Sequence, residues 1–175
     1  LILSPFWPLI RGIVSLHHGV PVEVPTLGVD DADELLALLK QKVTDRTAAI
    51  YVNTPNNPTG RIYSSKFLET IAEFARSYGL WIWSDDVYEG IIFDGQANSV
   101  RAFAPERTFS VYSFSKTYGM AGNRCGDILG PNADVMSSVR KATVPHYYSA
   151  CTASQLAAAT VLQNGSEWLS TAIHH

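Results

Sequence analysis

The sequence predicts an α/β fold with a mostly parallel sheet flanked by helices. Short apolar runs of strand length alternate with longer segments whose apolar residues recur at helical spacing. Continuous apolar runs are typical of strands that are buried on both faces, as in parallel sheets. No internal repeat or low-complexity linker interrupts the alternation, and we expect residues 1–175 to form a single partial domain.

The first half of the chain begins this alternation. Residues 20–24, VPVEV, alternate like a short strand, and residues 30–43 follow with helical spacing. Asp31 is the expected N-cap of that helix, and Glu34 stands at the third position after it. Residues 47–53, TAAIYVN, form a continuous apolar run, after which TPNNPTG ends all regular structure.

The second half repeats the pattern. Ser64 or Ser65 is expected to cap the next helix, and Gly79 to end it in the left-handed conformation. The strand at 80–84, LWIWS, places Trp81 and Trp83 in the expected core. The remaining candidates are strands at 90–95, 107–115 and 124–130 and helices near 133–142 and 152–163.

Composition excludes several classes of function. Apolar residues make up 46% of the chain and charged residues 17%, as in a globular protein. A net charge of −3 without a basic stripe argues against a nucleic-acid partner, and no apolar run is long enough to span a bilayer. With only Cys125 and Cys151, a reduced, cytoplasmic location is expected. The terminal His174–His175 can be native or the remnant of a tag.

Three loops follow directly after predicted strands, at residues 53–60, 85–88 and 113–116. In open parallel sheets, ligands bind beyond the carboxyl ends of the strands, so these loops are expected to form one site. The sequence contains no GxGxxG or GxxxxGK[ST] motif, no GxSxG and no HExxH. His17, His18 and His146 have no partner at metal-ligand spacing, so no metal site is expected.

The third loop continues into SFSKTYGMAGNRCG, residues 113–126, which contains no acidic residue. A lysine without a carboxylate beside it can form an imine when its pKa is lowered. Ser113, Ser115 and Arg124 would supply hydroxyl and guanidinium donors to a phosphate, with Gly119 and Gly122 letting the chain fold back. Pyridoxal phosphate is a cofactor that combines an aldehyde with a phosphate.

The sequence resembles the class I/II aminotransferases, which are fold-type I pyridoxal-phosphate enzymes, over most of its length. NTPNNPTG is similar to the family's N-P-x-N-P-T-G, DDVY to D-E-x-Y, and SFSKTYGMAGNRCG to S-x-S-K-x-x-G-x-x-G-x-R-x-G. SPFW followed by GVPVEVP looks like the aromatic segment that precedes the family's next strand. Together, in this order and spacing, the motifs are specific.

The resemblance implies a role for each matching residue. Lys116 would form the Schiff base with the cofactor and then move the substrate's proton, while Asp85 would pair with the pyridine nitrogen. Tyr88 and Asn57 would bind the phenolic oxygen of the ring, with Asn57–Pro58 in the cis form. The phosphate would be held by Ser113, Ser115 and Arg124. Trp7 would stack on the ring, with Phe6 as the neighbouring candidate.

The chain also departs from the family pattern. Asp86 stands where the family has a glutamate, and it is expected not to touch the cofactor. The upstream phosphate loop, the distal arginine that binds the substrate carboxylate and the small domain are absent from this sequence. The chain is therefore expected to be inactive by itself and to form a homodimer in its full-length parent.

The expected function is transfer of an amino group between an α-amino acid and a 2-oxo acid. The residues named above would stabilise a carbanion but do not determine which reaction it undergoes. A lyase, a decarboxylase or an amino-acid oxidase or hydroxylase is therefore an alternative function. A third reading is the ligand-sensing, aminotransferase-like domain of a regulator, although the sequence contains no basic DNA-binding segment. The identity of the substrate amino acid is not readable from the sequence.

Overall fold

A six-stranded sheet organises the computed structural model, which describes residues 1–174. Its strands are β1 (Ile2–Ser4), β2 (Glu23–Pro25), β3 (Ala49–Asn53), β4 (Trp81–Asp85), β5 (Thr108–Ser113) and β6 (Gly126–Leu129). They lie in the order β2-β1-β3-β4-β5-β6, and only β6 runs antiparallel to its neighbour. The predicted α/β class with a mostly parallel sheet is confirmed, and His175 lies outside the described residues.

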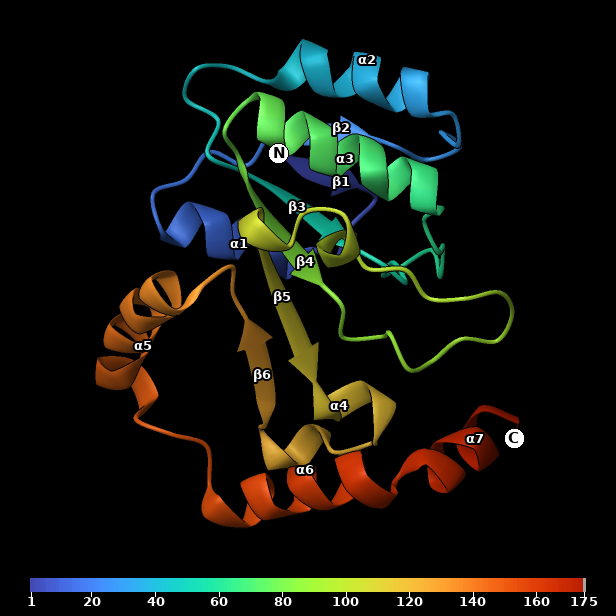
Figure 1. The fold of residues 1–175 in the computed structure, drawn as a ribbon, viewed down its shortest axis with the longest axis vertical. Helices are drawn as coiled ribbons and strands as arrows, with labels where there is room; N and C mark the ends of the chain where they lie inside the picture. The colour runs from blue at the N-terminus through green and yellow to red at the C-terminus, as the bar shows by residue number, and fades with distance from the viewer. Residues whose placement is uncertain (175) are drawn as a thin grey trace.

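The helices pack on both faces of this sheet and beyond its β6 edge (Figure 1). They are α1 (Leu9–Leu16), α2 (Ala32–Lys42), α3 (Ser65–Ser77), α4 (Phe114–Thr117), α5 (Ala133–Tyr147), α6 (Thr152–Asn164) and α7 (Ser166–His174). Short 3-10 turns occur at η1 (Val100–Ala102), η2 (Pro105–Arg107) and η3 (Ala121–Asn123). Figure 1 shows α2 and α3 side by side over the sheet, whereas α6 and α7 lie at the far end of the molecule.

The main core lies between the sheet and helices α2 and α3. Leu35, Leu39 and Leu68 from these helices are fully buried against Ile50 and Ile82 of the strands. On the opposite face, Ile10 of α1 covers Ile2 and Tyr51. Neighbouring side chains of a strand point to opposite faces, so Ile50 and Tyr51 contribute to different clusters. The face that carries Tyr51 also carries the candidate site.

The helix caps follow the predictions. The Asp31 carboxylate accepts hydrogen bonds from the backbone N–H of Asp33 and Glu34, each at 2.9 Å. Ser64 Oγ accepts one from the N–H of Phe67 at 3.2 Å, which makes Ser64 the cap of α3. Gly79 follows α3 with φ +67°, the left-handed conformation that ends the helix.

Two expectations about the strands were wrong. Residues 90–95 form no strand but part of a loop, because the apolar run is short and ends at Gly95, whose φ of +83° turns the chain. Trp81 and Trp83 are not core residues: they are 40% and 43% exposed, and both pack against Phe109. Their sheet face is covered by α1 only near β1 and β3 within residues 1–174, which leaves the β4–β5 part open.

Candidate active site

The three candidate loops meet at one edge of the sheet. Strand β4 lies between β3 and β5, all three are parallel, and Asn53 is directly opposite Asp85, which in turn is opposite Val111. The carboxyl ends of these strands therefore deliver the segments after Asn53, Asp85 and Ser113 to the same place. This arrangement is the crevice in which ligands bind in open α/β sheets.

Asp85 lies at the centre of this edge. Its Oδ2 accepts a hydrogen bond of 2.5 Å from the Tyr51 hydroxyl, and its backbone carbonyl accepts one of 2.9 Å from Asn53 Nδ2. Its other carboxylate oxygen, Oδ1, is buried and has no hydrogen-bond partner among the described residues. A buried acceptor without a donor is rare in native proteins and points to a group that binds there.

Burial determines the protonation of this pair. Burial raises the pKa of Asp85, and the hydrogen bonds from the Tyr51 hydroxyl and from the backbone N–H of Val87 oppose that rise. It also raises the pKa of Tyr51 far above its ordinary value, with the Asp85 charge acting in the same direction. The phenol therefore stays protonated and donates its hydrogen bond to Asp85 across the physiological pH range.

Asn57, Tyr88 and Lys116 come together from the three loops. The backbone N–H of Asn57 donates to Asn53 Oδ1 at 2.7 Å, and Asn57 Nδ2 donates to the Tyr88 hydroxyl at 3.3 Å. Lys116 Nζ lies 5.9 Å from the centre of the Tyr88 ring. The expected cis bond at Asn57–Pro58 is present, and further cis bonds occur at Thr54–Pro55 and Ser4–Pro5.

Trp7 approaches the same edge from the first strand. It packs, half-buried, against the cluster formed by Ile2, Ile10 and Tyr51, and Phe6 packs against that cluster as well. Tyr51 is the donor to Asp85, so Trp7 lies on the same sheet face as the carboxylate. Both aromatic candidates therefore pack on the sheet face that carries the site.

The residues expected to bind a phosphate are near one another in the chain but not bonded to one another. Ser113 Oγ caps the short helix α4 by accepting from the Ser115 N–H at 3.1 Å. Arg124 is exposed and donates to the Ala121 carbonyl at 2.8 Å, and no hydrogen bond joins it to either serine within residues 1–174. Loop 113–126 thus supplies these donors without arranging them into a closed clamp.

The chain was expected to fold back toward Arg124 at Gly119 and Gly122, and only one of these glycines has the expected conformation. Gly119 has a φ of +63°, as the sharp turn requires, but Gly122 lies inside the 3-10 turn η3 without a positive φ. The second left-handed residue is Arg124 itself, with φ +51°. A non-glycine residue in this region is uncommon and carries a conformational cost.

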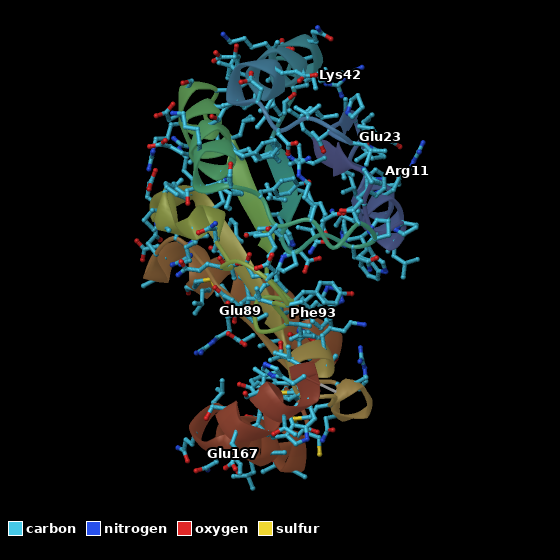
Figure 2. All side chains as sticks on the ribbon, turned by 90° about the vertical axis from the view of Figure 1, so that its right-hand side faces the viewer. Arg11, Glu23, Lys42, Glu89, Phe93 and Glu167 are labelled. Carbon is cyan, nitrogen blue, oxygen red and sulfur yellow. The ribbon has the colours of Figure 1, made fainter. Side chains whose placement is uncertain are left out.

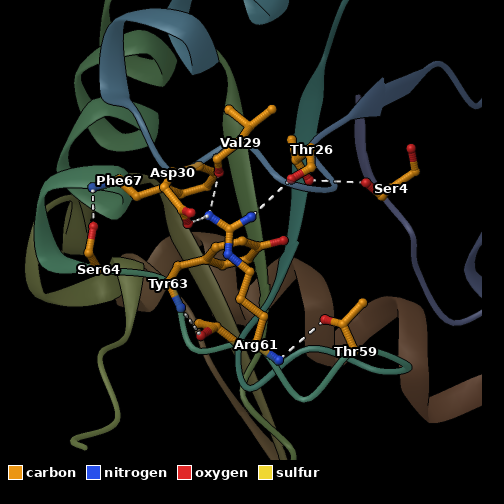
Figure 3. A network of polar contacts seen from close by, with 10 residues as sticks. Ser4, Thr26, Val29, Asp30, Thr59, Arg61, Tyr63, Ser64 and Phe67 are labelled. Carbon is orange, nitrogen blue, oxygen red and sulfur yellow. Dashed lines mark hydrogen bonds and ion pairs between the residues drawn. The ribbon is translucent and has the colours of Figure 1, made fainter.

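Hydrogen bonds of Arg61 fix the loop that carries Asn57 (Figure 3). The Asn56 N–H donates to the Arg61 carbonyl at 2.9 Å, while the guanidinium donates to the carbonyls of Thr26 and Val29 and to the Asp30 carboxylate. The guanidinium also lies 4.9 Å from the Tyr63 ring and 5.1 Å from the Phe67 ring. Arg61 thus ties the loop after β3 to the segment after β2.

A wide cavity of the molecule is distinct from this site. A cavity of about 1440 Å³ opens between α4, β6, α5 and α6, and Ser113 is the only predicted site residue that lines it. Asn57, Tyr88 and Lys116 instead contact one another at the ends of β3, β4 and β5, next to Asp85. Convergence of polar side chains rather than cavity size therefore identifies the candidate site.

Comparison with known proteins assigns the chain to a family. The family described as aminotransferase class I and II matches residues 1–172, which is nearly the whole chain. The chain belongs to the class I and II aminotransferases. No helix among residues 1–174 of this aminotransferase chain is both long and apolar enough to cross a membrane.

Curated relatives and solved structures agree with this assignment. An aromatic-amino-acid aminotransferase from Thermococcus litoralis is 39% identical over 173 residues, which are 96% of this chain and 44% of the relative. An aspartate/prephenate aminotransferase from Thermus thermophilus is 36% identical over 75% of this chain and 34% of its own length. The aminotransferase chain spans less than half the length of these relatives.

Among solved structures, the aspartate aminotransferase from Thermus thermophilus with maleate superimposes with a TM-score of 0.91. It is 32% identical, and the match covers 99% of this chain and 46% of the other. An aromatic aminotransferase from Pyrococcus horikoshii gives 0.87 at 35% identity, with the same 99% and 46% coverage. The fold of this part is therefore the aminotransferase fold.

Sequence reasoning missed two residues of the candidate site. Tyr51 is the donor to Asp85, and Asn53 binds both the Asp85 carbonyl and the Asn57 N–H. A tyrosine and an asparagine at the end of an otherwise apolar strand were the available signal, because polar groups in a buried strand need partners. The strand pairing that brings them to Asp85 was not visible in the sequence.

Proposed function

We propose that this chain is the cofactor-binding part of a pyridoxal-phosphate-dependent aminotransferase. The proposed reaction moves an amino group between an α-amino acid and a 2-oxo acid. The observation that carries the proposal is the buried Asp85 Oδ1, an acceptor without a donor, in a carboxylate whose other oxygen is already bonded to Tyr51. A protonated pyridine nitrogen is the kind of donor that such an acceptor lacks.

The residues present fit the cofactor. Asp85 would bind its ring nitrogen, and the Tyr88 hydroxyl and Asn57 amide, already bonded to each other at 3.3 Å, would bind the phenolic oxygen. Trp7 would cover one face of the ring. Lys116 lies on the short helix α4 directly after β5, with its Nζ 5.9 Å from the Tyr88 ring centre, and would hold the aldehyde carbon.

The phosphate would be bound by Ser113, Ser115 and Arg124, all exposed or half-buried donors on loop 113–126. Because Arg124 bonds to Ala121 in the chain alone, its guanidinium must turn from that carbonyl to a phosphate oxygen. A charge-assisted bond to a dianion is stronger than a bond to a backbone carbonyl, so this exchange is favourable.

When bound, pyridoxal phosphate supplies an electron sink that stabilises a carbanion at the substrate's α-carbon. The chain supplies the proton chemistry. Asp85, ionised beside a ring proton and supported by Tyr51, would keep that proton in place. Lys116 Nζ, once released, would take the α-proton and return it at a different carbon. Tyr88 and Asn57 would orient the ring between these two residues.

The names of the relatives support the proposed reaction class. They include aspartate, aspartate/prephenate and aromatic-amino-acid aminotransferases, which differ in substrate. We therefore propose the reaction without naming the amino acid. Homodimer formation in the full-length protein and cytoplasmic location remain predictions, to be tested by sedimentation equilibrium and by cell fractionation.

A labelling experiment tests the proposal. The full-length protein is loaded with pyridoxal phosphate and reduced with borohydride, which fixes the cofactor on the lysine that binds it, and the modified peptide is then mapped. We expect the label on Lys116, its loss in Lys116→Ala, and its retention in Lys66→Ala, a surface lysine paired with Glu69. Label on another lysine, or no label, refutes the proposed site.

Single amino acids then decide among reaction types. Transamination gives one equivalent of oxo acid and leaves the cofactor in its aminated form. Oxygen uptake indicates an oxidase or hydroxylase, and carbon dioxide or an eliminated group indicates a decarboxylase or lyase. Binding of the cofactor without turnover of any amino acid would favour a ligand-sensing domain instead.

A further inference from the structure

The loop between β4 and η1 carries Tyr88, and its two ends are joined by a buried acid. Residues 87–98 of this loop contain no helix or strand. Figure 2 shows Glu89 and Phe93 of the loop between the body of the sheet and the end of the molecule that holds α6 and α7. Phe93 is 82% exposed, so the middle of the loop has little packing of its own.

Asp86, at the start of the loop, is 1% exposed. Its Oδ1 accepts a hydrogen bond of 2.7 Å from Ser84 Oγ on strand β4, and its Oδ2 accepts one of 3.0 Å from Ser99 Oγ. Ser99 also caps η1, where the loop returns to regular structure. The Asp86 carboxylate therefore joins the strand before the loop to the turn after it.

The backbone of Asp86 is equally constrained. Its N–H donates to the Val111 carbonyl of β5 at 3.0 Å, and its carbonyl accepts from the Glu89 N–H at 3.0 Å. The second bond closes a turn around Tyr88, which stands two positions after Asp86. The orientation of the Tyr88 ring thus depends on the position of Asp86.

We propose that Asp86 is a positioning residue for Tyr88: by bonding Ser84 and Ser99 it closes the loop and holds the Tyr88 hydroxyl at Asn57. The inference rests on the proposed function, since the use of Tyr88 in binding the cofactor belongs to that function. A buried carboxylate that loses its donors is left uncompensated, so the closed loop is strongly favoured over the open one. Asn57 alone, through one bond of 3.3 Å, would hold Tyr88 less firmly.

The first test uses hydrogen exchange in the full-length, cofactor-free protein. Asp86→Ala should speed amide exchange in residues 87–98 by about tenfold or more, the factor expected for loss of hydrogen bonds to a charged group. Asp86→Asn should remain close to wild type, because the hydroxyls of Ser84 and Ser99 can reorient toward an amide. Asp94→Ala, in the exposed middle of the same loop, is the matched control and should cause no change.

Ser99→Ala is the milder variant and covers the case in which Asp86→Ala does not fold. This variant keeps the hydrogen bond from Ser84 to Asp86 and removes the one from Ser99. Amide exchange in residues 87–98 should therefore rise by a smaller factor than in Asp86→Ala. Unchanged exchange in both Asp86→Ala and Ser99→Ala would overturn the proposal.

The second test asks whether the effect passes through Tyr88. In the loaded protein, the pH titration of the cofactor absorbance is compared for Asp86→Ala, Tyr88→Phe and the double variant. We expect the single variants to shift the titration in the same direction, and the double variant to equal Tyr88→Phe alone. Additive shifts would mean that Asp86 acts elsewhere and would refute its positioning role. Failure of Lys116 to take the borohydride label would refute the proposed function while leaving the exchange result intact.

Discussion

Replacing Tyr51 by phenylalanine tests the electrostatic centre of the site. The substitution removes only the hydroxyl that donates to Asp85 Oδ2 at 2.5 Å and leaves the ring packed against Ile2 and Ile10. The backbone N–H of Val87 is then the one donor left near this mostly buried carboxylate among the described residues, because Oδ1 has no hydrogen-bond partner there. Since a hydrogen bond to a charged group contributes about 1.5–3 kcal/mol, we expect the free energy of unfolding to fall by about that amount at neutral pH.

The fall in the free energy of unfolding caused by Tyr51→Phe should be larger at high pH than at low pH. The lost bond stabilises the ionised form of Asp85, so its removal raises the pKa of that carboxyl further. Below the folded-state pKa, Asp85 is protonated in both proteins, and the difference should shrink to about 1 kcal/mol, the contribution of a neutral hydrogen bond. The difference between the two proteins should therefore grow as the pH rises.

Urea unfolding of the cofactor-free protein, followed by tryptophan fluorescence between pH 4 and pH 8, measures this difference. Tyr118→Phe is the matched control, because the Tyr118 ring packs against Phe114 and Trp168 and its hydroxyl has no hydrogen bond within residues 1–174. Its effect should stay within about 0.5 kcal/mol at every pH. A Tyr51→Phe loss that equals the control, or that does not change with pH, would refute the reasoning about Asp85.

Three further substitutions have defined outcomes. Asp31→Ala removes the N-cap of α2, so the free energy of unfolding should fall by about 1 kcal/mol in urea unfolding. Arg61→Met leaves the Val29 carbonyl without its donor, while the Thr26 carbonyl keeps the Val29 N–H, and should cost about 2 kcal/mol by the same measurement. Burial raises the pKa of Asp86 above its ordinary 3.8, so the folded protein keeps a proton that the unfolded chain loses, and stability falls as pH rises through that window. Asp86→Asn should remove this part of the pH dependence, seen as a flatter plot of urea midpoint against pH.

Conservative variants distinguish these specific effects from a general loss of stability. Asp31→Asn should preserve most of the cap, since asparagine is an equally good N-cap residue. Arg61→Lys should recover only part of the loss, because an ammonium cannot reproduce the planar fork or its stacking on Tyr63. An unchanged pH profile in Asp86→Asn would show that Asp86 has the same pKa in the folded and unfolded states.

Much of the fold was predictable because the signals for it are local. The cap at Asp31, the left-handed Gly79 and the apolar run before Asn53 depend on backbone chemistry and burial, which a short window of sequence expresses. The short β1, helix α1 and helix α7 were not predicted. Their segments are brief or carry no clear cap, and tertiary packing holds them in place.

The errors have a common cause. Trp81 and Trp83 were expected in the core because an apolar strand in a parallel sheet is normally covered on both faces. Whether a second layer covers a given strand depends on distant segments, and within residues 1–174 α1 covers β1 and β3 instead. The apolar residues 90–95 likewise read as a strand, but the loop closed by Asp86 and Ser99 leaves them no neighbouring strand to pair with.

By itself, the sequence determined the class of fold, the family and the three loops that carry the candidate site, because these depend on residue types at fixed spacings. The tertiary structure decided which side chains meet. Tyr51 reaches Asp85 only because β3 and β4 pair in one register, and Asp86 closes its loop only because Ser99 returns to β4. Contacts of this kind join residues far apart in the chain, and their geometry is set by the packing of the whole sheet.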